Sequence, residues 1–304
     1  MLTFGLVFLG SLASCLVLTP LFRKLAVKYQ LFDAPGDLKI HEKPIPYTGG
    51  VAIFFSFIFI LLVMVFIKKQ YVLEMTGIFF GGLLVTALGF FDDLKKINPF
   101  LRLGGQISAA VMLIVVGLYV KFIPIYVICI PLTIFYVVAS CNSMNLLDGM
   151  DGLVAGIVSI AAIGFLSLSI IQNNSLAILL SLILLGSALG FLPYNYNPAS
   201  IYMGDAGSNF LGFILATIMI TLTSEPYGIL SFVAPILVMG LPILDTLLAI
   251  ARRYRTKKQF YEGDREHFYD RLCAKGFTQK QTVFICYGIG MLFTSLGIFT
   301  MVLF

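Results

Sequence analysis

The chain has 304 residues, of which 59% are hydrophobic and 12% are charged, and its mean hydropathy is +0.99. A soluble domain is roughly 45–50% apolar and about 25% charged, so this composition excludes an ordinary soluble protein. Apolar runs of about 18–22 residues recur along the chain, which is long enough to cross a bilayer as helix. The alternating pattern of membrane barrel strands is absent. The net charge of +5 comes from basic residues beside these runs, where membrane orientation explains them without a nucleic-acid partner.

The apolar runs predict an all-α, polytopic membrane protein with about ten transmembrane helices in a single transmembrane domain, residues 1–304. The expected spans are 2–21, 49–67, 73–91, 104–120, 123–141, 153–171, 176–193, 207–223, 228–250 and 281–303. The ninth span contains Pro235 and Pro242, and proline interrupts helical hydrogen bonding, so we expect a kink there. Five scattered cysteines show no metal-binding spacing and are expected to be small buried side chains.

Charged residues gather on one side of this arrangement. Ten spans bring five connections to the same side, namely 22–48, 92–103, 142–152, 194–206 and 251–280. These connections carry 17 of the 20 Lys and Arg residues, so the positive-inside rule places them in the cytoplasm and both termini outside. Of the 15 Asp and Glu residues, only Glu74 and Glu225 fall toward the outside. We therefore expect the chemistry at the cytoplasmic membrane face.

A polar stretch, residues 142–152, separates two long apolar runs. It holds Asn142, Asn145, Asp148 and Asp151, spaced three apart. Polar groups near lipid are costly, so such a cluster indicates a function. Residues three apart drift by about 60° on a helix, so Asp148 and Asp151 would share a face while Asn142 would leave it. We expect a helix break here and treat Asn142 as structural.

Adjacent acids, Asp92 and Asp93, follow the third apolar run. Neighbouring carboxylates repel each other and must lose water near lipid, which a divalent cation or a role in proton handling would explain. The alternative is a solvated helix cap that pairs with Lys95 and Lys96. Asp245 is the one acid well inside an expected span, so we interpret it as functional or ion-paired within the bundle.

The other polar connections could meet phosphate. Asp205 opens an apolar helix between glycines; it is either a plain N-cap or part of a phosphate site at a helix start, with Tyr202 near enough to stack on a base. His267 lies in a basic connection and is either structural or a phosphate contact. In the first connection, Lys43 could meet an anion, and the following glycine pair allows close approach of a ligand or helix. The alternative is that the basic residues of this loop only set the orientation of the protein in the membrane.

These motifs, taken together, resemble the polyprenyl-phosphate N-acetylhexosamine-1-phosphate transferases. The matching residues are Lys43-Pro-x-Pro-x-x-Gly-Gly50, Asp92-Asp93, Asn145-x-x-Asp148-Gly-x-Asp151-Gly, and Asn195…Pro198-Ala…Met203-Gly-Asp205-x-Gly-Ser. The resemblance covers nearly the whole chain, including the ten-span topology. The motifs Asp33-x-Pro…Lys39-x-His41 and Asp264-Arg265-x-His267 are similar to the GlcNAc-1-phosphate transferase branch. The family commonly has further histidines after the one that matches His267, and this chain does not.

The resemblance implies Mg²⁺-dependent transfer of a HexNAc-1-phosphate, GlcNAc-1-phosphate first, from a UDP-sugar to undecaprenyl phosphate with release of UMP. Mn²⁺ is the alternative metal. The implied catalytic residues are Asp92, Asp93, Asp148 and His267. The implied metal ligands are Asp205 and Asp148. The implied substrate contacts are Lys43, Asn145, Asp151, Asn195, Tyr202 and Arg265. The resemblance also implies a bacterial plasma (inner) membrane location and the start of a lipid-linked cell-envelope glycan; a homodimer stays open.

Three other interpretations compete with this one. A transporter of an ion or nucleotide sugar would place its acids near mid-membrane within repeated halves, whereas only Asp245 lies that deep and no repeat is visible. A phosphatidyltransferase that uses CDP-alcohols would need a long downstream spacing of acids that is missing here. A purely structural membrane protein leaves the acids unexplained.

Overall fold

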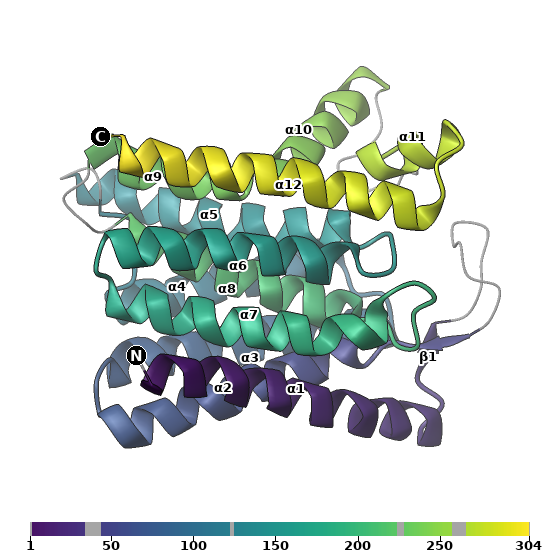
Figure 1. Ribbon diagram of the computed structural model, residues 1–304, viewed down its shortest axis with the longest axis horizontal. Coiled ribbons are helices and arrows are strands. Elements are labelled where there is room, and N and C mark those ends of the chain that lie inside the picture. Colours follow the sequence, from purple (N-terminus) through teal and green to yellow (C-terminus); the bar gives the residue numbers. More distant parts are fainter. Residues whose placement is uncertain (1, 34–43, 122–124, 224–227, 257–265, 304) are drawn as a thin grey trace.

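Twelve helices form most of the regular structure in the computed structural model, which describes residues 2–33, 44–121, 125–223, 228–256 and 266–303. The long helices lie side by side along one axis (Figure 1). The helices are α1 (Leu2–Lys28), α2 (Gly49–Lys68), α3 (Val72–Leu94), α4 (Pro99–Val115), α5 (Tyr126–Leu147), α6 (Leu153–Ile171), α7 (Ser175–Asn195), α8 (Gly204–Leu222), α9 (Gly228–Val238), α10 (Gly240–Arg255), α11 (Phe268–Ala274) and α12 (Gln279–Val302). A short antiparallel ladder pairs β1 (Phe32–Asp33) with β2 (Ile45–Pro46).

The helical, multi-span architecture expected from hydropathy is confirmed. Among the described residues, eight helices are long and apolar enough to cross a membrane, and the bent pair α9–α10 is a ninth candidate. The shorter apolar helix α4 has 17 residues. Every expected span overlaps one of these segments, and four of the five cysteines are buried as small apolar side chains.

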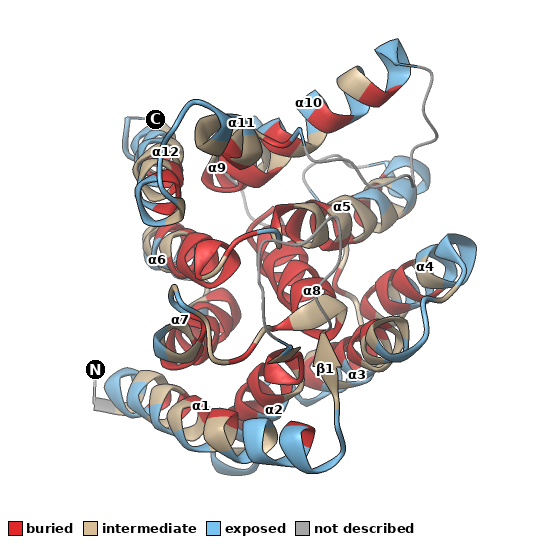
Figure 2. Cartoon of the chain, turned by 90° about the vertical axis from the view of Figure 1, so that its right-hand side faces the viewer, coloured by how far each residue is buried: buried red, intermediate tan, exposed pale blue. Residues whose placement is uncertain are grey.

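The expected kink in the ninth span is also confirmed. α9 and α10 meet at Met239 and are bent by 75° relative to each other. Pro235 lies inside α9 and Pro242 lies in the first turn of α10, and neither can donate a backbone hydrogen bond. As a result α10 points away from the bundle (Figure 2).

α8 lies at the centre of the bundle, where Figure 2 shows it buried among its neighbours. Within its most apolar window, 94% of the residues are buried. Glycine allows α3 and α5 to approach it closely. A Cβ at Gly89 of α3 would collide with the Asp205 carbonyl, and a Cβ at Gly212 of α8 would lie 2.5 Å from Cys141 Cα of α5. The beginning of α8 is therefore held against the ends of α3 and α5.

Polar side chains join the same helices below the surface. Gln106 of α4 donates to Asn209 Oδ1 of α8 at 2.9 Å, and Asn142 of α5 donates to Gln106 Oε1 at 2.8 Å. Asn209 in turn donates to the Asp205 carbonyl at 2.8 Å. Buried polar groups need such partners, and this chain of bonds supports the interpretation of Asn142 as structural.

The connections that carry the motifs lie at one end of the bundle. Figure 1 shows β1 and α11 at that end and both chain termini at the other. The helices extend beyond the apolar runs, so the expected connection 92–103 narrows to residues 95–98, and Asp92 and Asp93 lie in the last turn of α3. Hydropathy marks where apolar sequence stops, whereas a helix continues as long as its backbone hydrogen bonds are satisfied.

Candidate active site

Asp93 caps the beginning of α8. Its Oδ1 accepts the backbone N–H of Asp205 at 2.8 Å, and its Oδ2 accepts the N–H of Ala206 at 3.2 Å. The first N–H groups of a helix have no partner inside the helix, so a carboxylate from another helix satisfies them and suits the helix dipole. Gly204, at φ +67°, lets the chain turn so closely that a Cβ there would lie 2.5 Å from Asp93 Oδ2. Asp93 thereby sets the position of Asp205.

Asp92 lies beside Asp205 and shares a cation with it. Arg102 Nη1 is 3.1 Å from Asp92 Oδ2 and 3.6 Å from Asp205 Oδ2. The other oxygen of Asp92 accepts the N–H of Ile97 at 2.8 Å. Both carboxylates therefore lie within 4 Å of the same guanidinium nitrogen. Side chains of like charge at this separation need a proton or a cation between them.

Asn145 approaches Asp205 from α5. Its Nδ2 donates to Asp205 Oδ1 at 2.6 Å and to Ser208 Oγ at 3.2 Å. The predicted residues Asp92, Asp93, Asn145 and Asp205 are therefore brought together from three helices. Three motifs that are far apart in the sequence therefore meet in one cluster.

Asp148 is the residue that follows α5, and it is partly buried near the same cluster. Burial, with smaller contributions from the nearby carboxylates of Asp205, Asp151 and Asp33, raises the pKa of Asp148 to about 8. A cation beside Asp148 would oppose both effects. The Asp148 carboxyl is therefore close enough to Asp205 for the charge of Asp205 to raise its pKa.

The helix break expected at residues 142–152 is confirmed, but the shared helical face of Asp148 and Asp151 is wrong. α5 ends at Leu147 and α6 begins at Leu153, with Gly152 at φ +77° between them. Helical periodicity does not apply to the intervening turn. Asp151 Oδ2 accepts instead from Asn197 Nδ2 at 2.9 Å and from the N–H of Ala199 at 3.0 Å, and so it fastens the connection after α7.

Asn195 is buried and also holds this connection. Its Oδ1 accepts the N–H of Gly152 at 3.0 Å, and its Nδ2 donates to the Ile201 carbonyl at 3.1 Å. The amide oxygen and the amide nitrogen of Asn195 are therefore both hydrogen-bonded within the protein. Substrate contacts by Asp151 and Asn195 stay predictions.

The glycine pair that opens α2 packs against the beginning of α8. Gly49 and Gly50 donate backbone hydrogen bonds to the carbonyls of Tyr202 and Met203, both at 2.9 Å. A Cβ on Gly50 would collide with the backbone of Gly207. Of the two roles foreseen for the pair, close approach to a helix is the one observed. Burial and nearby carboxylates raise the pKa of Tyr202, which is half-buried.

His267 is buried and pairs with Asp245. Its Nδ1 is 2.7 Å from Asp245 Oδ2, and Asp245 Oδ1 accepts the N–H of Phe268 at 2.9 Å. The expectation that Asp245 is paired within the bundle is confirmed, although the sequence did not indicate its partner. Arg102 was also missed as a site residue. Its only signal was its position one turn into a helix that follows Asp92 after a short connection.

Two predicted substrate contacts, Lys43 and Arg265, lie outside the described residues. So do Lys39, His41 and Asp264.

The described residues contain no group of three or more His, Cys, Asp or Glu side chains that could hold a metal by themselves. Mg²⁺ is usually bound by one or two carboxylates together with waters and substrate phosphates rather than by a protein cage. The adjacent carboxylates of Asp92 and Asp205 are such a pair, and their mutual repulsion gives a cation a reason to bind.

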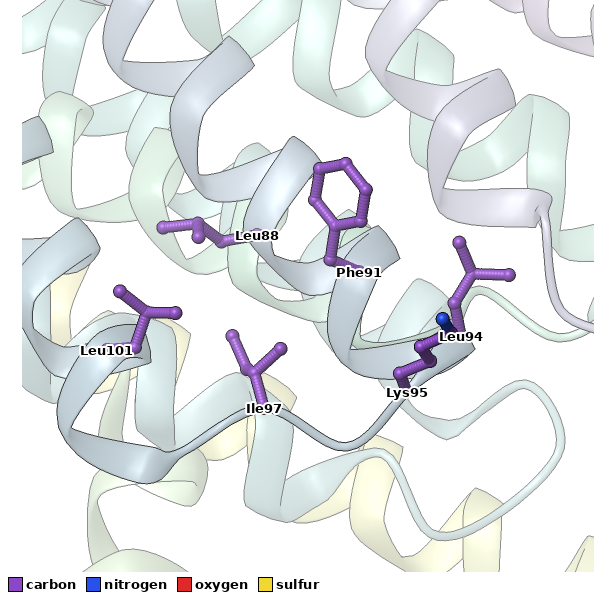
Figure 3. A pocket seen from close by; sticks show the side chains of 6 residues that line it. All are labelled: Leu88, Phe91, Leu94, Lys95, Ile97 and Leu101. Atoms are coloured by element: carbon purple, nitrogen blue, oxygen red, sulfur yellow. The ribbon is translucent and has the colours of Figure 1, made fainter.

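An apolar pocket of about 480 Å³ lies between α3 and α4, beside this cluster (Figure 3). It is lined by Leu88, Phe91, Leu94, Lys95, Ile97 and Leu101. Ile97 donates its N–H to Asp92, so a single hydrogen bond joins the pocket wall to this carboxylate. The only charged group in the lining is the Lys95 ammonium.

Comparison with known proteins identifies the family. Residues 75–223 match the family model of glycosyl transferase family 4. The chain is 33% identical over 298 residues to a probable undecaprenyl-phosphate N-acetylglucosaminyl 1-phosphate transferase of Bacillus subtilis, covering 94% of this chain and 82% of that protein. It is 30% identical over 308 residues to a decaprenyl-phosphate N-acetylglucosaminephosphotransferase of Mycobacterium leprae, with coverage of 88% and 76%.

A third relative, the undecaprenyl-phosphate alpha-N-acetylglucosaminyl 1-phosphate transferase of Escherichia coli, is 30% identical over 312 residues, with coverage of 94% of this chain and 82% of that protein. The family-model match spans Asp92, Asn145 and Asp205. The chain therefore belongs to the polyprenyl-phosphate N-acetylhexosamine-1-phosphate transferases, a family of membrane phosphoglycosyltransferases.

Proposed function

We propose that this protein transfers a HexNAc-1-phosphate, with GlcNAc-1-phosphate as the preferred group, from a UDP-sugar to undecaprenyl phosphate. The products are UMP and a lipid-linked sugar that starts a cell-envelope glycan. The names of the relatives support the polyprenyl acceptor and the sugar phosphate. The paired carboxylates of Asp92 and Asp205, with Arg102 at 3.1 and 3.6 Å, are the observation that carries the proposal.

The reaction that we propose is a displacement at phosphorus. An oxygen of the lipid phosphate attacks the β-phosphorus of the donor, a new P–O bond forms, and the bond to the bridging oxygen breaks so that UMP leaves with the electron pair. Mg²⁺, when bound, would neutralise charge on the diphosphate. Asp205 and Asp92 would hold it, with Asp148 near enough to contribute. Both a direct attack and a two-step route through an aspartyl-phosphate agree with this arrangement.

The other residues of the site orient the reacting groups. Asp93 fixes the backbone of Asp205, and Asn145 fixes its side chain through Oδ1. Arg102 adds positive charge where the anionic acceptor and donor would meet, which stabilises charge that develops on phosphoryl oxygens. Asp92, at the end of α3 beside the apolar pocket, would orient the lipid phosphate. His267, Tyr202 and Asp151 would face the donor.

We place this site on the cytoplasmic face of a bacterial plasma (inner) membrane, with ten crossings and both termini outside. α4 would supply the fourth crossing and the bent pair α9–α10 the ninth, in addition to the eight long helices. The distribution of Lys and Arg supports this orientation, since 17 of 20 belong to connections on one side. Both termini lie at the opposite end of the bundle from the candidate site, as an even number of crossings requires (Figure 1).

One assay tests the proposal. Purified protein is incubated with undecaprenyl phosphate, MgCl₂ and either UDP-GlcNAc, UDP-GalNAc or a rarer UDP-amino sugar, and released UMP and lipid-linked sugar are measured. We expect both products with UDP-GlcNAc and neither after chelation of the metal. Asp205→Asn should abolish UMP release although the protein inserts normally. Glu74→Gln, an acid at the opposite end of α3, is the matched control and should retain activity.

Two results would contradict the proposal. Unchanged activity of Asp205→Asn would remove Asp205 from the metal site. Movement of the UDP-sugar across proteoliposomes without UMP formation would indicate a transporter instead.

A further inference from the structure

Asp245 is buried at the inner face of α10, and both of its carboxylate oxygens are used. Asp245 is only 2% exposed. Oδ2 lies 2.7 Å from His267 Nδ1 and Oδ1 accepts the N–H of Phe268 at 2.9 Å, so both bonds reach the connection between α10 and α12. A carboxylate taken out of water is costly unless it is fully hydrogen-bonded, and here its partner is an equally buried histidine, 4% exposed.

This contact determines how the imidazole of His267 is protonated. An ionised carboxylate can only accept hydrogen bonds, so we assign the proton to the Nδ1 atom that faces Asp245. The ring is also fixed in its plane, because Tyr269 stacks on it with centroids 5.4 Å apart and an interplanar angle of 6°. The orientation and the tautomer of His267 are therefore both set by neighbours.

The same neighbours connect His267 to the carboxylate cluster. The Tyr269 hydroxyl donates to the Leu146 carbonyl at 3.1 Å, and its ring covers Gly149 so closely that a Cβ there would collide with it. Leu146 and Gly149 flank Asp148. A displacement of His267 would therefore be transmitted through Tyr269 to the turn that carries Asp148.

We propose that Asp245 is a positioning residue of the transferase: it holds His267 with Nδ1 protonated and its ring fixed beside the turn of Asp148. This inference rests on the proposed function for its catalytic consequence, although the pairing itself does not. Asp245 would touch neither substrate nor metal. It acts through His267 alone.

A purely structural role for Asp245 is the competing explanation, since it also fastens α11 to α10. The substitution Asp245→Asn separates the two roles. The amide oxygen can still accept the N–H of Phe268, whereas the amide nitrogen now donates to His267 Nδ1 and forces the proton onto Nε2. The fold contact is kept and the tautomer is reversed. Thr246→Val is the matched control, because Thr246 is the next residue of α10 and bonds Ser143 of α5 rather than His267.

The experiment combines spectroscopy, kinetics and stability on the full-length protein in detergent or nanodiscs. The chain has only two histidines, so [¹⁵N]histidine labelling gives signals from two imidazole rings, and His41→Gln assigns them. The ¹⁵N shifts report which ring nitrogen is protonated. Turnover with undecaprenyl phosphate and UDP-GlcNAc is measured for wild type, Asp245→Asn, His267→Asn, the double variant and Thr246→Val, together with Tm.

We expect protonated Nδ1 in the wild type and protonated Nε2 in Asp245→Asn. Loss of a residue that orients a functional group commonly costs about 10–100-fold, so kcat of Asp245→Asn should fall by about that factor while KM for both substrates and Tm change little. The double variant should be no slower than His267→Asn, because Asp245 acts only through His267. Thr246→Val should match the wild type in both kcat and ¹⁵N spectrum.

Three results would overturn the inference. One is an unchanged histidine spectrum in Asp245→Asn. Another is a fall in the Tm of Asp245→Asn that accounts for its loss of activity. The third is a double variant whose loss of activity is the product of the losses in Asp245→Asn and His267→Asn. A wild type that shows the expected spectrum but transfers no sugar phosphate would refute the proposed function instead, and the pairing of Asp245 with His267 would stand.

Discussion

Asp93 of α3 holds the backbone of Asp205 of α8, with hydrogen bonds of 2.8 Å to its N–H and 3.2 Å to the next N–H. The two residues are far apart in sequence, and the geometry requires Gly204 between the helix and the loop. A side chain at Gly204 would meet Asp93 Oδ2 at 2.5 Å and would have to adopt φ +67°. The contact gives the second acid of the Asp92-Asp93 pair a structural role in placing Asp205.

Gly204→Ala should therefore damage both stability and activity. An unfavourable positive φ costs on the order of 1–3 kcal/mol, and the displaced Asp93 would release the N–H of Asp205. We expect a fall in Tm of several degrees and a loss of turnover of about tenfold or more, since ~1.4 kcal/mol in a barrier is tenfold in rate. Gly288→Ala in α12 is the control, because nothing lies within 4 Å of its added Cβ. Equal behaviour of the two variants would argue against the Asp93 contact.

The membrane spans could be predicted from sequence because each is a run of apolar residues long enough to cross a bilayer as a helix. Asp92, Asp148 and Asp205 could be singled out because acids amid apolar sequence are costly. What the sequence did not show was which side chains meet. Asp245 and His267 are separated by 22 residues, and Arg102 reaches Asp92 and Asp205 only because α3 and α4 form a tight hairpin.

Periodicity also failed where the helix stopped. Asp148 and Asp151 would share a face on a continuous helix, but the turn ending at Gly152 directs Asp151 to Asn197 and leaves Asp148 near Asp205. Asp151 and Asn195 thus have loop-holding contacts that no spacing rule indicated. Backbone conformation at one glycine decided which carboxylate joined the cluster.

Arg102→Gln should change how the site uses Mg²⁺. Arg102 supplies positive charge to both Asp92 and Asp205, so its removal leaves the carboxylates more negative and raises their attraction for a cation. We expect a lower Mg²⁺ concentration for half-maximal activity together with a lower kcat, because the charge on the phosphates is less well neutralised. Binding of Mn²⁺ measured by electron paramagnetic resonance checks the affinity independently of turnover.

The control for Arg102 is Lys96→Gln, which removes an exposed charge from the neighbouring connection. It should leave both the Mg²⁺ requirement and kcat unchanged. If Arg102→Gln binds Mn²⁺ as the wild type does, the metal does not lie beside Arg102, and the site would have to be sought nearer Asp148.

The proposed orientation predicts opposite labelling of the two bundle ends. In a Cys273→Ser background the remaining cysteines are buried, and single cysteines can replace exposed Lys96 and Lys69. A membrane-impermeant maleimide should label Lys69→Cys in intact cells and Lys96→Cys only in inverted vesicles. Reversed labelling would refute the orientation. Labelling of both from the same side would show that the span count between them is wrong.

The pocket between α3 and α4 predicts where the acceptor lipid binds. An undecaprenyl chain must reach Asp92 from within the bilayer, and this apolar pocket of about 480 Å³ adjoins Asp92 through Ile97. Leu101→Trp should fill it, because Leu101 is part of its lining and indole is much larger than isobutyl. We expect KM for undecaprenyl phosphate to rise about tenfold while KM for the UDP-sugar stays constant, since ~1.4 kcal/mol of lost apolar contact is tenfold in affinity.

Leu103→Trp is the matched control for this prediction, because Leu103 is an exposed leucine of the same helix that does not line the pocket. A tryptophan there adds the same bulk to α4 without entering the pocket, so it should leave both KM values unchanged. If Leu101→Trp also leaves them unchanged, the acceptor does not use this pocket. The exposed leucines of α10 (Leu244, Leu247 and Leu248) would then be the apolar surface to test, because α10 leaves the bundle at 75° from α9 and carries Asp245 on its buried side.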